Sequence, residues 1–224
     1  MRFLVTGSSG HLGEALVRTL HERGTDVIGL DIRPSEWTNV VGSVSDVDVV
    51  AEAMAGVDVV VHTATLHKPQ LAFLPRRAFV DTNVSGTLTL LEAAADADVR
   101  AFVMSSSTTV FGDALIPAAV EPAAWIDESV VPTPKNVYGV TKAAAEDLCQ
   151  LAFAIKVCPA WCCGCRASFP NPMTCPTRLT GAAMTTSRPM NMLRGGPGTT
   201  ARISALRHLG HHAVHIRRLT AVEN

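Results

Sequence analysis

RFLVTGSSGHLG, residues 2–13, decides the fold of this chain. It opens with a short apolar run typical of a buried strand, and a helical pattern begins at His11. Gly7 allows a tight turn, Gly10 lets the backbone approach a ligand that a Cβ atom would exclude, and Gly13 lets the helix pack close to a sheet. Because the first N–H groups of a helix have no partners within the helix, this stretch predicts a phosphate-binding loop.

A second strand is expected at residues 26–32, DVIGLDI, and it places Asp31 18 residues after Gly13. A carboxylate at this position accepts hydrogen bonds from both hydroxyls of an adenosine ribose and repels the extra phosphate of NADP. The pattern therefore predicts a dinucleotide site that prefers NAD. Two alternatives stay open: Asp31 is only a turn residue at the strand end, and Arg33 leaves a small opening for NADP.

Strand and helix patterns alternate throughout the first 155 residues. The further expected elements are strands at 57–64 and 100–107 and helices at 11–24, 45–56, 76–97 and 136–155. This alternation is typical of βαβ units. We predict an α/β fold, a Rossmann-like doubly wound parallel sheet with helices on both faces. Residues 1–155 are expected to form one NAD-binding domain.

Residues 156–224 differ in kind from the preceding sequence. No acidic residue lies between Asp147 and Glu223, and five of the six cysteines fall within residues 158–175. Because hydrophobic periodicity is weak and Pro and Gly are scattered, we expect an irregular, poorly ordered tail in place of a substrate domain. Acid-free, arginine-rich composition is typical of a coding sequence read out of frame. We therefore hypothesise that the C-terminal part is aberrant or truncated.

The cysteines and histidines of this tail suggest zinc binding as an alternative function, because zinc prefers these ligands. Cys162 and Cys165 have CxxC spacing, but 42 residues separate Cys165 from His208. Compact zinc motifs place their ligand pairs about 12–20 residues apart. We therefore expect no metal site, with unpaired thiols as the simpler interpretation. The other candidate ligands are Cys158, Cys163, Cys175, His211, His212 and His215.

Tyr138, the only tyrosine, and Lys142 are candidates for proton transfer. Their spacing of four residues on a predicted helix places both side chains on one face. An adjacent ammonium group favours the phenolate form of a tyrosine, which has an ordinary pKa of about 10. Tyr138 could then accept a hydroxyl proton while hydride leaves for a nicotinamide, and Lys142 would also bind the nicotinamide ribose.

Together these motifs resemble the extended short-chain dehydrogenases/reductases, and within them the NAD-dependent epimerase/dehydratase family, which includes nucleotide-sugar epimerases. The resemblance covers residues 1 to about 155. The matching motifs, in the order and spacing of the family, are TGSSGHLG (6–13), HTAT (62–65), NVSGT (83–87), SSSTTVFG (105–112) and YGVTK (138–142).

The resemblance implies further site residues. Ser107 would complete a catalytic set with Tyr138 and Lys142 by hydrogen-bonding the reacting oxygen. Asn83 either contacts the cofactor or holds two strands together, and His67 occupies a position where the family often has lysine. The positions that the resemblance and the motifs assign to the NAD site are Gly7, Ser9, Gly10, His11, Leu12, Gly13, Asp31, Ala64, His67, Asn83, Tyr138 and Lys142.

One departure from the family narrows the expected chemistry. Thr108 and Thr109 stand where the sugar dehydratases have an acidic pair, so dehydration is not expected. We expect an NAD-dependent epimerase or dehydrogenase that acts on the alcohol or carbonyl of a sugar, in particular a nucleotide-linked sugar. The alternative is an NAD-binding module without turnover, because no substrate domain is recognisable.

The remaining expectations concern partners and location. The family implies a homodimer formed through helices at 76–96 and 136–154. A net charge of −1 gives no reason to expect nucleic acid or an anionic membrane as a partner. No apolar run approaches the roughly 18 residues that a membrane span needs. The chain begins with a strand and a glycine turn rather than a signal peptide, so we expect a cytoplasmic protein.

Overall fold

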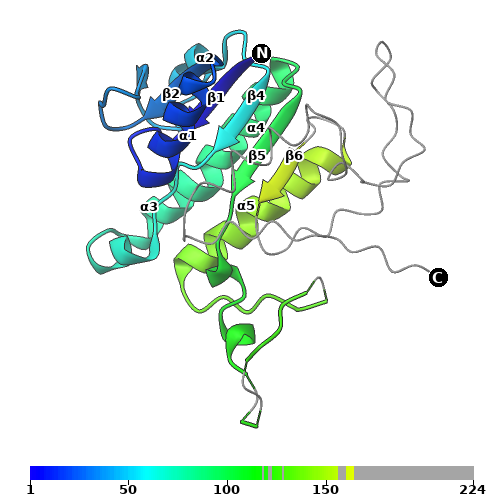
Figure 1. Cartoon of the computed structure of the whole chain (residues 1–224). Helices are drawn as coiled ribbons and strands as arrows, with labels where there is room; N and C mark the ends of the chain where they lie inside the picture. Colours follow the sequence, from blue (N-terminus) through cyan, green and yellow to red (C-terminus); the bar gives the residue numbers. More distant parts are fainter. Residues whose placement is uncertain (118, 121–122, 128, 156–159, 164–224) are drawn as a thin grey trace, which may run out of the picture. The chain divides into compact units, whose positions relative to one another are not determined.

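The computed structural model describes residues 1–117, 119–120, 123–127, 129–155 and 160–163. Within these residues the chain forms a parallel sheet of six strands in the order β3-β2-β1-β4-β5-β6, shown in Figure 1. Every neighbouring pair is parallel. The strands are β1 (Arg2–Thr6), β2 (Asp26–Asp31), β3 (Val40–Val41), β4 (Val59–His62), β5 (Ala101–Ser105) and β6 (Ala160–Cys163).

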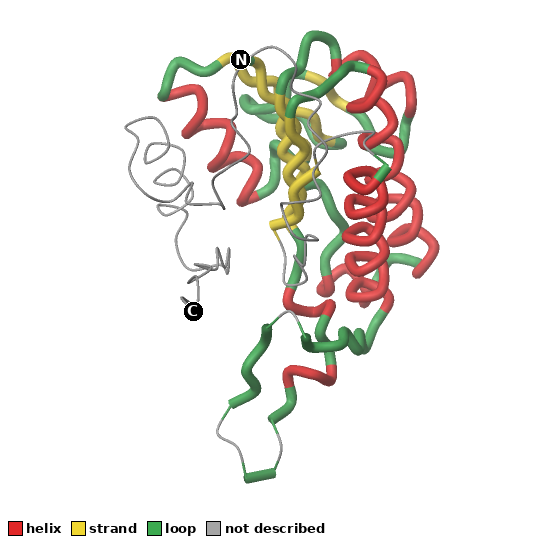
Figure 2. Tube along the Cα trace, turned by 90° about the vertical axis from the view of Figure 1, so that its right-hand side faces the viewer, coloured by secondary structure: helices red, strands yellow, loops and turns green. Residues whose placement is uncertain are grey.

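Helices cover both faces of this sheet. In Figure 2, where the sheet is seen nearly edge-on, one helix lies on one side and several lie on the other. The helices are α1 (His11–Glu22), α2 (Val47–Met54), α3 (Arg76–Val80), α4 (Gly86–Asp96) and α5 (Val137–Ala154). Short helical turns are η1 (Lys68–Ala72), η2 (Asp81–Ser85), η3 (Thr108–Val110) and η4 (Asp113–Leu115). The predicted α/β Rossmann-like class is confirmed.

The larger core lies between the sheet and α2, α4 and α5. Alternate residues of β4 and β5 are buried on this face, as the two-residue period of a strand requires. Val60, Phe102 and Met104 are fully buried there. Burial of each such side chain stabilises the fold by about 1.5–3 kcal/mol. This core fixes the strands whose carboxyl ends carry the candidate site.

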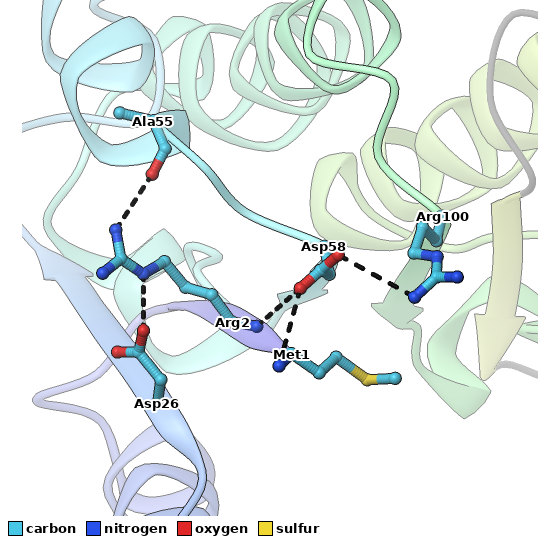
Figure 3. Close-up of polar contacts among 6 residues, drawn as sticks. All are labelled: Met1, Arg2, Asp26, Ala55, Asp58 and Arg100. Atoms are coloured by element: carbon cyan, nitrogen blue, oxygen red, sulfur yellow. Dashed lines mark hydrogen bonds and ion pairs between the residues drawn. The ribbon is translucent and has the colours of Figure 1, made fainter.

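Polar contacts join the amino ends of the strands, at the edge of the sheet where the chain begins (Figure 3). The Arg2 Nε atom donates to Asp26 over 2.7 Å, and the backbone N–H of Arg2 donates to the Asp58 carboxylate over 2.8 Å. Arg100 lies 4.0 Å from the same carboxylate. These contacts hold the amino ends of the strands together, and the loops that follow the strands form the candidate site at the opposite edge.

The predicted elements are confirmed except at three places. The helix expected over 76–97 is interrupted by a π-helical turn, η2, between α3 and α4. The short strand β3 was not expected. The expectation that regular structure ends near residue 155 is wrong, because β6 pairs with β5. The open edge of β5 carries backbone groups that need partners, and the chain after α5 returns to supply them.

Most of the predicted tail lies outside the described residues. Residues 164–224 are in that part of the chain, and so are almost all of the candidate zinc ligands. Cys162 and Cys163 are exceptions, because their backbone belongs to β6.

Candidate active site

The phosphate-binding loop follows β1 and depends on the absence of side chains. Gly7 has a φ angle of +75°, and a Cβ atom there would lie 2.8 Å from the backbone nitrogen of Ala64. A Cβ atom on Gly13 would lie 1.9 Å from the carbonyl oxygen of Gly7. Gly10 is the N-cap of α1, and no side chain caps this helix. The loop therefore turns tightly and leaves the start of α1, at His11 and Leu12, uncapped.

Ser9 and Asp31 lie side by side at the ends of this loop and of β2. The hydroxyl of Ser9 is shielded from solvent and has no hydrogen-bond partner among the described residues. Asp31 is buried, and its carboxylate accepts hydrogen bonds from the backbone N–H groups of Ser9 at 3.1 Å and Arg33 at 2.9 Å. An unsatisfied hydroxyl, an uncapped helix and a buried carboxylate fit the pyrophosphate and adenosine ribose of a dinucleotide.

A chain of hydrogen bonds leads from this loop to the next. The hydroxyl of Thr6 accepts from the Ala64 N–H at 3.2 Å and lies 2.7 Å from His62 Nδ1. The hydroxyl of Thr87 donates to the Asn83 carbonyl at 2.8 Å and lies 3.0 Å from His62 Nε2. Because the Thr87 hydroxyl already donates its hydrogen to Asn83, it can only accept from His62. His62 must therefore donate from Nε2 to Thr87 and accept at Nδ1 from Thr6. The network therefore fits only one neutral tautomer of His62.

His62 is held in the neutral form by its surroundings. Its side chain is buried in the core and its pKa is lowered from 6.5 to about 3. Burial disfavours the charged imidazolium, and the nearby charge of Lys142 acts in the same direction. Sequence analysis assigned no role to this histidine, although it begins the HTAT motif.

Asn83 lies in the π-helical turn and is saturated by contacts within the protein. Its side-chain oxygen accepts from Thr65 and from the Leu66 N–H at 2.9 and 2.8 Å. Its side-chain nitrogen donates to the Leu66 carbonyl and to the Thr141 hydroxyl, both at 3.1 Å. Asn83 therefore fastens the loop after β4 to α5. Of the two expected roles, this geometry favours holding the fold together, although it joins a loop and a helix rather than two strands.

The loop after β5 and helix α5 bring the expected catalytic residues together. Tyr138 and Lys142 are both buried on α5. The Lys142 ammonium group donates to the carbonyl of Ser105 at 2.7 Å. The hydroxyl of Ser107 lies 2.8 Å from that of Thr109 and also hydrogen-bonds the phenol of Tyr138.

The acidity of Tyr138 differs from the sequence-based expectation. We expected the neighbouring ammonium to lower its pKa, but the pKa is raised above the ordinary value because the phenol is buried, and the hydrogen bond with Ser107 only opposes that shift. In the protein alone, Tyr138 is therefore a neutral phenol at physiological pH.

Glu146 is a site residue that sequence analysis missed. It is buried one turn beyond Lys142 on α5, and its carboxylate accepts a hydrogen bond from the hydroxyl of Ser106. Together with the contact from Lys142 to Ser105, this bond fixes the segment that carries Ser107. The signal was present, because positions 138, 142 and 146 repeat at helical spacing on one face.

His67 lies beside Tyr138. Its Nδ1 atom is 3.4 Å from the hydroxyl oxygen of Tyr138, and the two ring centroids are 5.7 Å apart. Its pKa is lowered, first by partial burial and then by the charge of Lys142. The structure thus brings His67 to the candidate base, Tyr138.

The sheet order, the glycine loop after β1 and the tyrosine–lysine pair on α5 define the class of nucleotide-binding Rossmann-fold dehydrogenases. A family model described as the NAD-dependent epimerase/dehydratase family matches residues 3–165. The chain belongs to this family. The match continues past the limit of about residue 155 that sequence analysis set, and it includes β6.

Individual relatives have several activities. A 3-beta-hydroxysteroid dehydrogenase of Mycolicibacterium neoaurum is 38% identical over 119 residues, 49% of this chain and 32% of its own. A UDP-glucose 4-epimerase of Streptomyces lividans is 30% identical over 158 residues, 66% of this chain and 46% of its own. A solved short-chain dehydrogenase/reductase of Agrobacterium tumefaciens with bound NAD has a TM-score of 0.64 and 32% identity, covering 72% of this chain and 48% of its own. The chain thus spans half or less of the length of these proteins.

Two further findings concern membrane-spanning helices and groups of metal-binding side chains. Among the described residues no helix is long and apolar enough to cross a bilayer. In the same residues, no three His, Cys, Asp or Glu side chains are grouped so that they could hold a metal ion.

The buried neutral His62 predicts acid sensitivity. Below pH 6.5 the unfolded chain binds a proton at this residue that the folded chain rejects until pH reaches about 3. As pH falls through this range, protonation of His62 in the unfolded chain should therefore lower the free energy of unfolding by about 1.4 kcal/mol per pH unit. Urea unfolding at a series of pH values measures the slope. His62→Gln should flatten it, and exposed His21→Gln should not; equal slopes in all three proteins would contradict the prediction.

Proposed function

We propose that this chain binds NAD and that Ser107, Tyr138 and Lys142 use it for hydride transfer at a secondary alcohol or a carbonyl. One observation carries the proposal: the carboxyl edge of a single parallel sheet presents both a glycine loop with a buried carboxylate and a set of three residues, the partly buried Ser107 and the buried Tyr138 and Lys142. Ligands of open α/β sheets bind at this edge.

The cofactor would be held mainly by the loops after β1 and β2. Ser9 offers a hydroxyl that has no partner among the described residues, and the start of α1 offers backbone N–H groups to the pyrophosphate. Asp31 has two oxygens for the ribose hydroxyls, and its charge disfavours NADP. Ala64 lies against Gly7 and would border the adenosine. Asn83 would act only indirectly, through the loop that it fastens.

Bound NAD supplies a hydride acceptor and, in its oxidised form, a positive charge. Tyr138 receives the hydroxyl proton of the substrate, and Ser107 orients the reacting oxygen. Because burial raises the pKa of the phenol, the phenolate needs additional positive charge close by. Lys142 supplies one such charge from the same helix face and, through Ser105, holds the loop of Ser107 in place.

The substrate class that we propose is a nucleotide-linked sugar. The supporting observations are the family and the relative that is a UDP-glucose 4-epimerase. Dehydration is disfavoured, because Thr109 hydrogen-bonds Ser107 and offers no carboxyl group. The hydroxysteroid dehydrogenase relative makes a sterol alcohol the second candidate.

Replacing Asp31 with Ala should raise the Kd for NAD at least about tenfold, which corresponds to about 1.4 kcal/mol, because the ribose loses its acceptor. It should also reduce the preference for NAD over NADP. Isothermal titration calorimetry measures both constants. Asp26→Ala is the matched control, since Asp26 is exposed at the opposite end of the same strand. An unchanged Kd in the Asp31 variant would remove the proposed cofactor site.

Tyr138→Phe should lower turnover by about 100-fold or more, the usual contribution of a general acid–base group, while the Kd for NAD stays within about twofold. A screen of UDP-sugars, dTDP-sugars and hydroxysteroids, followed by NADH absorbance and product analysis, identifies the reaction. Equal turnover in the wild type and the variant excludes Tyr138 as the base. NAD binding without turnover on any substrate class would instead support a binding module.

We also propose a homodimer formed through α4 and α5. Leu88 on α4 and Val140 and Leu151 on α5 are 42–54% exposed and would supply apolar side chains to this interface. Leu88→Glu should shift the protein to monomer in analytical ultracentrifugation, because a charge in an apolar interface is costly. Ile32→Glu, at another exposed apolar position, is the control. A monomeric wild type would refute the interface.

A further inference from the structure

One contact of Tyr138 is not used by the mechanism above. His67 comes from the loop after β4 and Tyr138 from α5, yet His67 Nδ1 lies 3.4 Å from the phenol oxygen. The phenol is 5% exposed, whereas the imidazole is exposed. His67 therefore connects the buried hydroxyl of Tyr138 with the protein surface.

We propose that His67 is the group through which Tyr138 exchanges its proton with solvent, so that the enzyme carries out net oxidation of an alcohol or net reduction of a carbonyl. The inference rests on the proposed function and specifies its reaction class. Oxidation of a secondary alcohol gives a carbonyl, a hydride accepted by the cofactor and one proton. The proton passes from the substrate hydroxyl to Tyr138, from Tyr138 to His67 Nδ1, and from the imidazolium to water. Reduction follows the reverse path.

The neighbours of Tyr138 favour this path. Lys142 on α5 is a cation with no lone pair to accept a proton, and its charge favours a neutral imidazole at His67. Ser107, from the loop after β5, hydrogen-bonds both Thr109 and the phenol of Tyr138, but a serine hydroxyl is a much weaker base than a neutral imidazole. A neutral imidazole has one basic nitrogen, and the pKa of His67, lowered from 6.5 by partial burial and then by the charge of Lys142, keeps the ring neutral at neutral pH.

Epimerisation and net oxidation differ in where the proton taken from the substrate hydroxyl must go. In an epimerisation the proton that leaves one hydroxyl returns to the same substrate, so no exit is needed. In a net oxidation one proton per turnover must reach solvent. An imidazole between a buried phenol and the surface is useful only in the second case.

The contact is tested first in the full chain without cofactor, where Tyr138 is the only tyrosine. Ultraviolet absorbance of the tyrosinate therefore reports the ionisation of Tyr138 without overlap from another tyrosine. NMR follows the ionisation of His67. His67→Phe keeps the ring but removes the acceptor, so the Tyr138 midpoint should fall by about half a pH unit. Tyr138→Phe should raise the pKa of His67 by a similar amount. His21→Phe is the control. If the Tyr138 midpoint does not move in His67→Phe and the His67 midpoint does not move in Tyr138→Phe, the proposal is overturned.

The second test measures turnover of the substrate that the screen identifies. His67→Ala should lower kcat about tenfold or more with little change in KM, and free imidazole should restore it, which a structural role would not allow. In the wild type, oxidation should slow as pH falls through the pKa of His67, which burial and the charge of Lys142 place below the ordinary value, and one proton should be released per NADH formed.

Several results would decide against this role. If His67 instead holds the cofactor, the Kd for NAD rises in the Ala variant and both midpoints stay unchanged. Epimerised product without NADH formation also refutes it. If the wild type binds no NAD or turns over no substrate, the proposed function fails, while the absorbance and NMR titrations still decide whether His67 and Tyr138 are coupled.

Discussion

The site depends on a continuous hydrogen-bonded path that joins its two halves. The path begins at Thr6, beside the phosphate-binding loop, and passes through His62 and Thr87 to Asn83. From Asn83 it continues to Thr141, whose hydroxyl donates to the backbone carbonyl of Tyr138 at 3.0 Å. Because almost all of these groups are buried, each must keep its partner or incur the cost of an unsatisfied polar group. The position of α5, which carries Tyr138 and Lys142, is thereby tied to the loop proposed to bind the cofactor.

The same path shows why a histidine lies in the core. His62 joins two hydroxyl groups that come from different elements, and only an imidazole with one protonated nitrogen serves both. Lys142 lies close enough to lower the pKa of His62 and of His67. Burial, reinforced by this ammonium group, therefore favours the neutral form of both histidines. The proton transfer proposed for Tyr138 would take place in that setting.

Much of the fold was predictable because it rests on local patterns. The glycine loop, the strand ending in Asp31 and the helix that carries Tyr138 and Lys142 all follow from hydrophobic periodicity and turn chemistry. β6 was missed because its four residues have no distinctive pattern, and its place depends on the open edge of β5. The interruption of the helix at 81–85 was missed for a similar reason, since a π-helical turn is stabilised by tertiary contacts of Asn83.

Most residues of the candidate site could be predicted from the sequence, but the contacts between them could not. Spacing along the chain is enough to show which elements form, that a carboxylate ends β2, and that positions 138, 142 and 146 share one helix face. Only the tertiary structure decided that burial raises the pKa of Tyr138, that Asn83 is saturated, and that His67 lies against the phenol. Those properties arise from groups distant in sequence, whose dielectric surroundings and hydrogen-bond partners exist only after the strands and loops have packed.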